Sequence, residues 1–328
     1  MYNLTNQLLE QYDMDFGGIQ KGRGVYVCST QRGNVVIKQF TGSRTHVESM
    51  SEILDALQEE GIRADRILRT KEGGLLAKDV DETLYYARWQ LPGRECETKE
   101  RGDVLTAMRL LGQMHSALEK KEIACQIVPR DALQNELQKH NREIRKVRNY
   151  VHGKNKKNEF EMIFMRHYQI FLNQAEESEK SLREWKEQQK ESDIRQMYGI
   201  CHGDYNQHNI LIDQKGGQLT NFEQTCYDMR VRDLAHFLRK LMEKHNWNVA
   251  LSEELLAAYE KERRLSEAEW RQLSIRLSYP EKFWKVANHY FNSNKAWVSA
   301  RDIEKLNRVI EQEEIRQEFL RNMFHFIR

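Results

Sequence analysis

Residues 201–212 read Cys-His-Gly-Asp-Tyr-Asn-Gln-His-Asn-Ile-Leu-Ile, and this stretch decides the fold. It places Asp204 and Asn209 five positions apart, directly before an apolar run. The glycine pair that follows, Gly216 and Gly217, predicts a turn. Two polar side chains at this spacing can face one small volume on a tight loop that enters a strand, whereas a regular helix would turn them away from each other.

This layout is typical of a kinase catalytic loop. In such a loop an Asp takes the proton from a substrate hydroxyl, and an Asn five residues later ligates a metal on the nucleotide phosphates. We therefore predict that Asp204 is the catalytic base and that Asn209 is a metal ligand. His202 is expected to pack under the loop and hydrogen-bond its backbone, not to act as a general base.

A lysine on a predicted strand supplies the positive charge for the phosphates. Lys38 follows the apolar run Val35–Ile37, and a cation on a rigid strand can hold the α and β phosphates still. A helix carboxylate should orient this lysine. Glu48 and Glu52 lie four residues apart on one helix face, so their spacing does not separate them, and we prefer Glu52. The alternatives are an exposed lysine and a surface carboxylate.

The metal-binding acid of a kinase is missing at its expected place. Residues 218–223 read Gln-Leu-Thr-Asn-Phe-Glu, so Asn221 stands where an Asp is expected. Its neutral carbonyl oxygen replaces the carboxylate that Mg²⁺ prefers, which predicts metal binding weaker by about 10- to 100-fold. Glu223, placed on the same face by strand alternation, is the alternative metal ligand.

Asp233 is the predicted support of the catalytic loop. It lies in the sequence Arg-Asp-Leu-Ala, about thirty residues after the loop. A carboxylate there can accept hydrogen bonds from the loop backbone, and it also suits the N-cap of the helix that follows.

Residues 1–91 are predicted to form a nucleotide-binding lobe with a small antiparallel sheet and one main helix. The alternation of apolar residues and the turn signals predict the following elements: a hairpin over 24–40, a helix over 45–60, a second hairpin over 66–80 and a strand over 84–91. A glycine-rich phosphate loop is poorly formed, because no G-x-G-x-x-G precedes the first strong strand.

Residues 92–328 are predicted to form a large, mainly helical lobe that carries the catalytic loop. A charged helical insertion spans about 120–197, and we expect the acceptor substrate to lie under it. A helical tail of three or four helices spans about 248–328. The two lobes together predict an α+β, bilobal, protein kinase-like fold.

The composition excludes several other classes of protein. The chain of 328 residues has 31% charged and 39% hydrophobic residues and a formal net charge of +2, which gives no reason to expect a nucleic acid partner. No apolar stretch approaches the ~20 residues of a membrane span. Five scattered cysteines fit free thiols in a reducing cytoplasm.

The catalytic-loop residues resemble a known group of enzymes. The stretch from His202 to Asn209 is similar to the loop of the aminoglycoside phosphotransferase and choline kinase group, which shares the protein-kinase fold. A closer resemblance is to the CotS family of bacterial spore coat proteins within that group. It rests on this loop and on three further regions: Asp233-Leu-Ala-His-Phe-Leu-Arg-Lys240 with Glu243, Lys244 and Trp247; Tyr279-Pro-Glu-Lys-Phe-Trp284 with Tyr290 and Lys295-Ala-Trp297; and, more weakly, the Lys38 strand with the hinge-like Tyr86 to Gly93.

The resemblance implies a bilobal kinase-like protein of the spore coat, made in the mother-cell cytoplasm. It implies ATP and Mg²⁺ as cofactors and other coat proteins as partners. Residue by residue, it assigns the base to Asp204, a metal ligand to Asn209, the phosphate lysine to Lys38 and the loop support to Asp233. In the hinge-like stretch it places four residues beside the nucleotide: Arg88, Trp89, Gln90 and Leu91.

Two functions stay open at this point. The first is ATP-dependent phosphotransfer to a hydroxyl of a small molecule or sugar, with a weakened metal site; Lys38, Asp204 and Asn209 favour it. The second is a degenerate kinase fold, or pseudokinase, that serves as a structural or assembly component of the coat; Asn221 and the poor glycine loop favour it. The sequence does not specify the acceptor, the oligomeric state or the coat partners.

Overall fold

The computed structural model describes residues 5–22, 24–121, 133–292 and 300–325. The chain forms two compact units. The first comprises Met1–Pro129, Gly199–Tyr227 and Ala258–Arg263, and the second comprises Arg130–Tyr198, Asp228–Ala257 and Arg264–Arg328. The catalytic loop thus groups with the N-terminal sheet, and the predicted lobe boundary at residue 91 stays a prediction. Lys295 to Trp297 of the resemblance lie outside the described residues.

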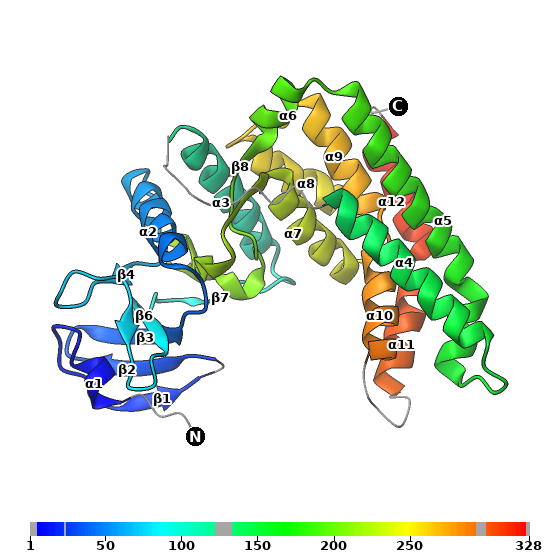
Figure 1. The fold of residues 1–328 in the computed structure, drawn as a ribbon. Coiled ribbons are helices and arrows are strands. Elements are labelled where there is room, and N and C mark those ends of the chain that lie inside the picture. The colour runs from blue at the N-terminus through cyan, green and yellow to red at the C-terminus, as the bar shows by residue number, and fades with distance from the viewer. Residues whose placement is uncertain (1–4, 23, 122–132, 293–299, 326–328) are drawn as a thin grey trace. The chain divides into compact units, whose positions relative to one another are not determined.

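An antiparallel sheet forms one part of the first unit (Figure 1). Its strands follow the order β1-β2-β3-β6-β4, and β5 also pairs with β6. The bounds are β1 Ile19–Lys21, β2 Tyr26–Thr30, β3 Gly33–Gln39, β4 Ile67–Leu68, β5 Ala77–Lys78 and β6 Leu84–Trp89. Lys38 on β3 lies opposite Tyr86 on β6, and Val36 lies opposite Arg88. Because side chains alternate along a strand, these four residues share one face of the sheet.

The predicted first hairpin is confirmed, whereas the second is wrong. β4 and β5 do not pair with each other, because both pair with the six-residue β6. The turn between them closes on itself through a hydrogen bond of 2.8 Å from the Thr70 amide to the Gly74 carbonyl. The longer strand thus offers one continuous edge to two short neighbours.

The main helix of the first unit is α2, Arg44–Glu59, as its apolar spacing predicts. The Ser43 side chain caps it by accepting from the His46 amide, and Gly61 ends it with a φ of +75°. A short helix not predicted from the sequence, α1 (Asn6–Leu9), packs Leu8 and Leu9 into the sheet core.

Most of the elements around the catalytic loop belong to the first unit, and the unit boundary falls within two of the strands, Tyr198–Cys201 and Cys226–Met229. A three-stranded sheet follows the order β10-β9-β7, and β8 pairs with β11. The bounds are β7 Arg94–Glu95, α3 Arg101–Glu119, β8 Tyr198–Cys201, β9 Ile210–Asp213, β10 Gly216–Leu219 and β11 Cys226–Met229, with the 3₁₀ turns η1 Gln207–Asn209 and η2 Phe222–Gln224. The catalytic loop therefore connects β8 to the β9–β10 hairpin.

The second unit is helical (Figure 1). Its helices are α4 Leu133–His152, α5 Glu159–Gln188, α6 Glu191–Met197, α7 Val231–Lys244, α9 Glu267–Ser278, α10 Glu281–Asn292, α11 Ala300–Glu311 and α12 Glu313–Met323; α8, Val249–Glu260, crosses the unit boundary. Stacked rings of Phe164, Phe171 and Phe283 form part of its core. The described tail has five helices, more than the three or four predicted.

The small antiparallel sheet and the mainly helical remainder confirm the predicted α+β class. Among the described residues, every helix is either too short or too polar to cross a membrane.

Candidate functional site

The catalytic loop is held in a conformation that requires glycine. Gly203 has a φ of +80°, and a Cβ built there would overlap the carbonyl oxygen of Gln224 and lie 2.7 Å from its carbonyl carbon. The loop thus passes directly over the backbone of η2 at this point. Because no other residue fits, the glycine brings the following Asp204 close to the segment of residues 220–224.

His202 is buried beneath this loop and links the loop backbone to the backbone of Thr220, which follows β10. Its Nδ1 accepts from the Asp204 amide at 3.3 Å, so the ring proton lies on Nε2, which donates to the Thr220 carbonyl at 3.0 Å. The ring also lies 4.6 Å from the ring of Phe222, measured between centroids. This is the structural role expected for the histidine.

Asp204 and Asn209 come together as their spacing predicts. The Asn209 side chain donates from Nδ2 to the Asp204 carbonyl at 2.8 Å and to its carboxylate Oδ2 at 3.1 Å. Asn209 is buried, whereas Asp204 is half-buried. The amide therefore fixes the carboxylate of a residue that is only half-buried.

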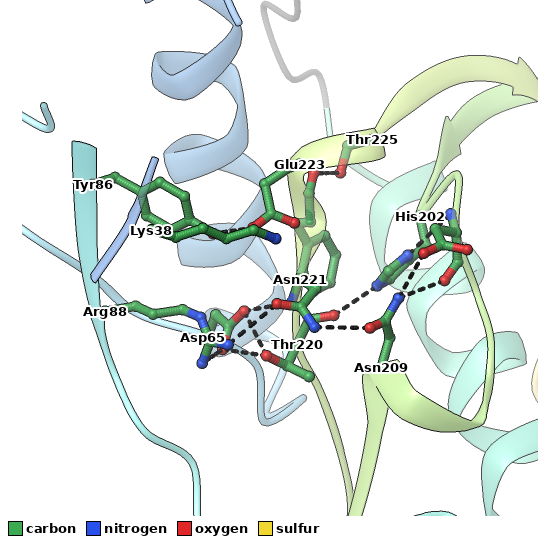
Figure 2. Close-up of polar contacts among 12 residues, drawn as sticks. Lys38, Asp65, Tyr86, Arg88, His202, Asn209, Thr220, Asn221, Glu223 and Thr225 are labelled. Atoms are coloured by element: carbon green, nitrogen blue, oxygen red, sulfur yellow. Dashed lines mark hydrogen bonds and ion pairs between the residues drawn. The ribbon is translucent and has the colours of Figure 1, made fainter. Parts of the chain in front are cut away.

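A chain of hydrogen bonds leads from Asn209 to Asn221 and on to Arg88 (Figure 2). Asn221 donates from Nδ2 to Oδ1 of Asn209 at 2.8 Å and accepts on its own Oδ1 from Nη2 of Arg88 at 3.2 Å. Its backbone is left-handed, with a φ of +65°, a conformation that Asn adopts more readily than most residues. We call Arg88, Asn221, Asn209 and Asp204 the amide chain.

Arg88 and Asp65 form a buried ion pair at the far end of this chain. Nη1 of Arg88 lies 3.0 Å from Oδ1 of Asp65, and the two side chains are 9% and 2% exposed. Asp65 also accepts from the Thr220 hydroxyl at 2.9 Å and from the Asn221 amide at 2.6 Å. These bonds fix both the guanidinium and the backbone of the segment that carries Asn221.

Lys38 pairs with Glu223, not with a carboxylate of α2. Its Nζ lies 2.8 Å from Oε1 of Glu223, which also accepts from the Tyr86 hydroxyl (Figure 2). The prediction that Glu52 orients the lysine is wrong, since Glu52 is exposed and Glu48 pairs with Arg44 instead. The buried apolar stripe of α2 already fills its inner face, so both glutamates point outward.

The strand alternation predicted for Glu223 is also wrong. Residues 222–224 form the turn η2, so Glu223 does not share a face with Asn221 in the manner of a strand. His46 of α2 contacts the Glu223 carbonyl through Nε2 at 2.9 Å and holds the turn. The carboxylate therefore serves Lys38 and Tyr86.

The ionisation of Glu223 follows from these contacts. Burial opposes its charge and is the largest single effect, but the hydrogen bond and charge of Lys38, with help from Tyr86, hold the pKa of Glu223 below its ordinary value. Burial, together with the negative charge of Glu223, raises the pKa of Tyr86. The tyrosine hydroxyl thus stays a donor to a charged carboxylate.

Replacing Glu223 with glutamine should change how stability depends on pH. A carboxyl group whose folded pKa is lowered stabilises the fold above its unfolded pKa, and this contribution is lost as the pH falls through the folded pKa. Wild type should therefore lose more stability than Glu223→Gln between about pH 6 and about pH 3. At neutral pH the variant should be less stable by about 1–3 kcal/mol. Urea unfolding at several pH values measures the free energy of unfolding of the two proteins. If that free energy changed equally with pH in both, the ion pair between Glu223 and Lys38 would be contradicted.

The residues predicted to hold Mg²⁺ do not fit this ion. The ligand oxygen of Asn209 accepts a hydrogen from Asn221, that of Asn221 accepts one from Arg88, and the Glu223 carboxylate is bound to Lys38 and Tyr86. Mg²⁺ demands near-octahedral oxygen ligands, usually with one or two carboxylates. Among the residues assigned to the site from the sequence, Asp204, which is half-buried and bonded to the Asn209 amide, remains as a charged candidate.

The other predicted site residues lie as follows. Trp89 lies under the Arg32 guanidinium, and Gln90 is bonded to Asn34 through side chain and backbone. Leu91 is half-buried after β6. Asp233 is buried in the first turn of α7 in the second unit. The N-cap prediction for it is wrong, because α7 begins at Val231 and its N-cap is Arg230.

Three residues of the site were not assigned a role from the sequence. Asp65 follows α2 in an irregular stretch, and its partner Arg88 lies on a strand that returns beside it. His46 and Tyr86 contact Glu223 from α2 and β6. The hinge-like stretch from Tyr86 to Gly93 indicates the strand that carries Tyr86. Nothing near Asp65 or His46 in the sequence distinguishes these two from surface residues.

Comparisons with known proteins identify the family and agree with the fold. A family model described as "Spore coat putative kinase YutH" matches residues 5–323. Spore coat protein S of Bacillus subtilis (strain 168) is 21% identical over 305 residues, which cover 92% of this chain and 87% of that protein.

Solved structures of phosphotransferases share the fold. An aminoglycoside phosphotransferase from Alicyclobacillus acidocaldarius superposes with a TM-score of 0.86 at 20% identity, over 100% of this chain and 97% of the other. The amicoumacin kinase hAmiN, in complex with AMP-PNP, Ca²⁺ and Ami, gives a TM-score of 0.62 at 15% identity, over 94% and 90%. The predicted kinase-like fold and the resemblance to this group are confirmed. The chain belongs to the YutH family of kinase-like spore coat proteins.

Proposed function

We propose that this spore coat protein binds ATP in its first unit and transfers the γ-phosphoryl group to a hydroxyl of a small molecule or sugar. One observation carries the proposal: the Asp204 carboxylate is held by the Asn209 amide, on a residue that is only half-buried. A proton acceptor so fixed suits a hydroxyl that must lose its proton as it attacks. The hydroxyl oxygen bonds to the γ-phosphorus, the bond to the bridging oxygen breaks, the proton goes to Asp204, and ADP leaves.

Lys38 supports the same proposal from the sheet. Its side chain is 30% exposed, and its ammonium is fixed by Glu223, whose turn lies beside the amide chain. A cation positioned in this way can contact phosphate oxygens without reorganising. The solved complex of amicoumacin kinase with AMP-PNP supports an adenine nucleotide as the ligand class. We place Arg88, Trp89, Gln90 and Leu91, with Lys38, in the binding region for this nucleotide, and we retain Asp233 as a proposed loop support.

We also propose that the protein is made in the mother-cell cytoplasm and joins the coat beside other coat proteins. Its family and its relative from Bacillus subtilis support the coat association. A second candidate function is that of a scaffold without turnover, a pseudokinase. The amide chain favours it, because the two amide oxygens proposed for a metal are already hydrogen-bonded.

Nucleotide binding is tested by thermal unfolding of the full chain with millimolar ATP. Wild type should be stabilised, since a ligand at about 100 times its dissociation constant adds ~2.7 kcal/mol. Lys38→Ala should abolish the shift, because the variant lacks the phosphate-binding cation. Lys21→Ala, an exposed lysine on β1 of the same sheet, is the matched control and should shift as wild type does.

The melting temperatures without nucleotide show whether Lys38→Ala is folded. A wild-type protein that ATP does not stabilise, with or without Mg²⁺ or Mn²⁺, would contradict nucleotide binding and favour the scaffold. An equal shift in Lys38→Ala would leave binding intact but remove Lys38 from the site.

A further inference from the structure

We infer that this site binds the nucleotide phosphates without a divalent cation, because the amide chain anchored on Arg88 closes the position that a metal would take. The inference rests on the proposed function, since it concerns how the same nucleotide is held. It goes further by naming the ligand form: the metal-free polyphosphate anion, not its magnesium complex.

The direction of the amide chain is fixed by its two ends. Arg88 can only donate hydrogen bonds, and an ionised Asp204 can only accept them. Asn221 must therefore turn its oxygen to Arg88 and its NH₂ to Asn209, and Asn209 must turn its NH₂ to Asp204. Every oxygen and NH₂ group between the ends is matched. A cation at Asn209 Oδ1 would lie beside the NH₂ of Asn221, which bonds the same oxygen and whose hydrogens carry partial positive charge.

Arg88 keeps the chain in place from a rigid position. Its guanidinium is buried on β6 and is paired with Asp65, which also bonds the Asn221 backbone. The guanidinium thus fixes the amide oxygen of Asn221 while the backbone of the same residue is held separately. A side chain restrained at both points cannot turn its oxygen toward Asn209 without breaking the bond to Arg88.

The side chain at position 221 presents no negative charge to a phosphate. A carboxylate at position 221 would repel phosphate unless a cation screened it, and this chain has a neutral amide there. The negative charge of Glu223 is matched by Lys38 at 2.8 Å. Paired in this way, Lys38 offers the phosphates hydrogen-bond donors from a side chain that is 30% exposed.

The same geometry predicts what aspartate at position 221 would do. One carboxylate oxygen would take the bond from Arg88, and the other would face Oδ1 of Asn209, where a donor now stands. Two acceptors facing each other cannot share a hydrogen bond, whereas a divalent cation can join them. Asn221→Asp should therefore create a metal requirement that wild type lacks.

Calorimetric titration of ATP into the full chain tests the inference. In wild type, ATP should bind at least about tenfold more weakly in excess Mg²⁺ than in EDTA, because Mg²⁺ converts most of the metal-free anion to its complex. In Asn221→Asp, Mg²⁺ should tighten ATP binding by about tenfold or more relative to EDTA. Asn173→Asp, on the exposed face of α5 in the second unit, introduces the same charge and should behave as wild type.

A second readout needs no nucleotide. Electron paramagnetic resonance of added Mn²⁺ should show the ion free with wild type and with Asn173→Asp, and bound with Asn221→Asp. Wild type that binds ATP about tenfold more weakly in EDTA would overturn the inference while leaving the proposed function standing. Wild type that binds Mn²⁺ as well as Asn221→Asp does would also overturn it. ATP binding in neither buffer would overturn the proposed function, and the inference with it.

Discussion

Replacing Gly203 with alanine is expected to lower the free energy of unfolding by about 2–5 kcal/mol. A non-glycine residue with a left-handed backbone costs about 1–2 kcal/mol, and forcing a methyl group into a filled space costs about 1–3 kcal/mol more. Both apply here, because φ is +80° and the new Cβ would overlap the Gln224 carbonyl. Urea unfolding followed by circular dichroism measures the change.

Gly102→Ala provides the control for this variant. Gly102 lies in the first turn of α3 in the same unit, with nothing within 4 Å of an added Cβ. It should change stability by no more than about 1 kcal/mol, in the favourable direction. Since Gly203 positions both Asp204 and η2, its alanine variant should also lose the stabilisation by ATP. Wild-type stability in Gly203→Ala would show that the loop does not pass over Gln224 as described.

Replacing Asp204 with asparagine is expected to reduce phosphoryl transfer by about 10²–10⁴-fold, the usual contribution of a positioned general base. The substitution keeps the shape of the side chain and an oxygen that can accept from Asn209, so it removes the base without dismantling the amide chain. ATP affinity should therefore change by less than about threefold, which calorimetry can measure beside turnover on a panel of hydroxyl compounds.

Asp55→Asn is the matched control, because Asp55 lies on the exposed face of α2. It should turn over as wild type does. Full activity in Asp204→Asn would place the proton acceptor elsewhere. Wild type that binds ATP but transfers phosphate to no hydroxyl, and does not hydrolyse ATP, would favour the scaffold function over the enzyme.

The elements with a local pattern could be predicted from the sequence. Apolar residues at helical spacing predict the helix α2, and alternating β-forming residues predict the strands around Lys38. The loop from His202 to Asn209 combines a fixed spacing with a following apolar strand. In each of these cases neighbours in the sequence determine the structure.

The contacts that hold the site were harder to predict, because they join distant segments. Asp65 and Arg88 meet only because β6 returns beside the end of α2, and no spacing encodes that pair. Glu223 reaches Lys38 because η2 replaces an extended strand, which changes the direction of its side chain. The apolar stripe of α2 can be seen in the sequence, and it places Glu52 on the outer face of the helix, away from Lys38.

The position of Glu223, the ion-pair partner of Lys38, has a consequence for protein engineering. Glu223 lies in the same short turn as Asn221, so the lysine and the metal position are served by one five-residue segment, 220–224. A replacement of this whole segment that places an acid at position 221 and none at position 223 would change the metal position and remove the carboxylate partner of Lys38 at the same time. Such a replacement would leave the ammonium without a counter-ion unless α2 received an inward-facing acid as well.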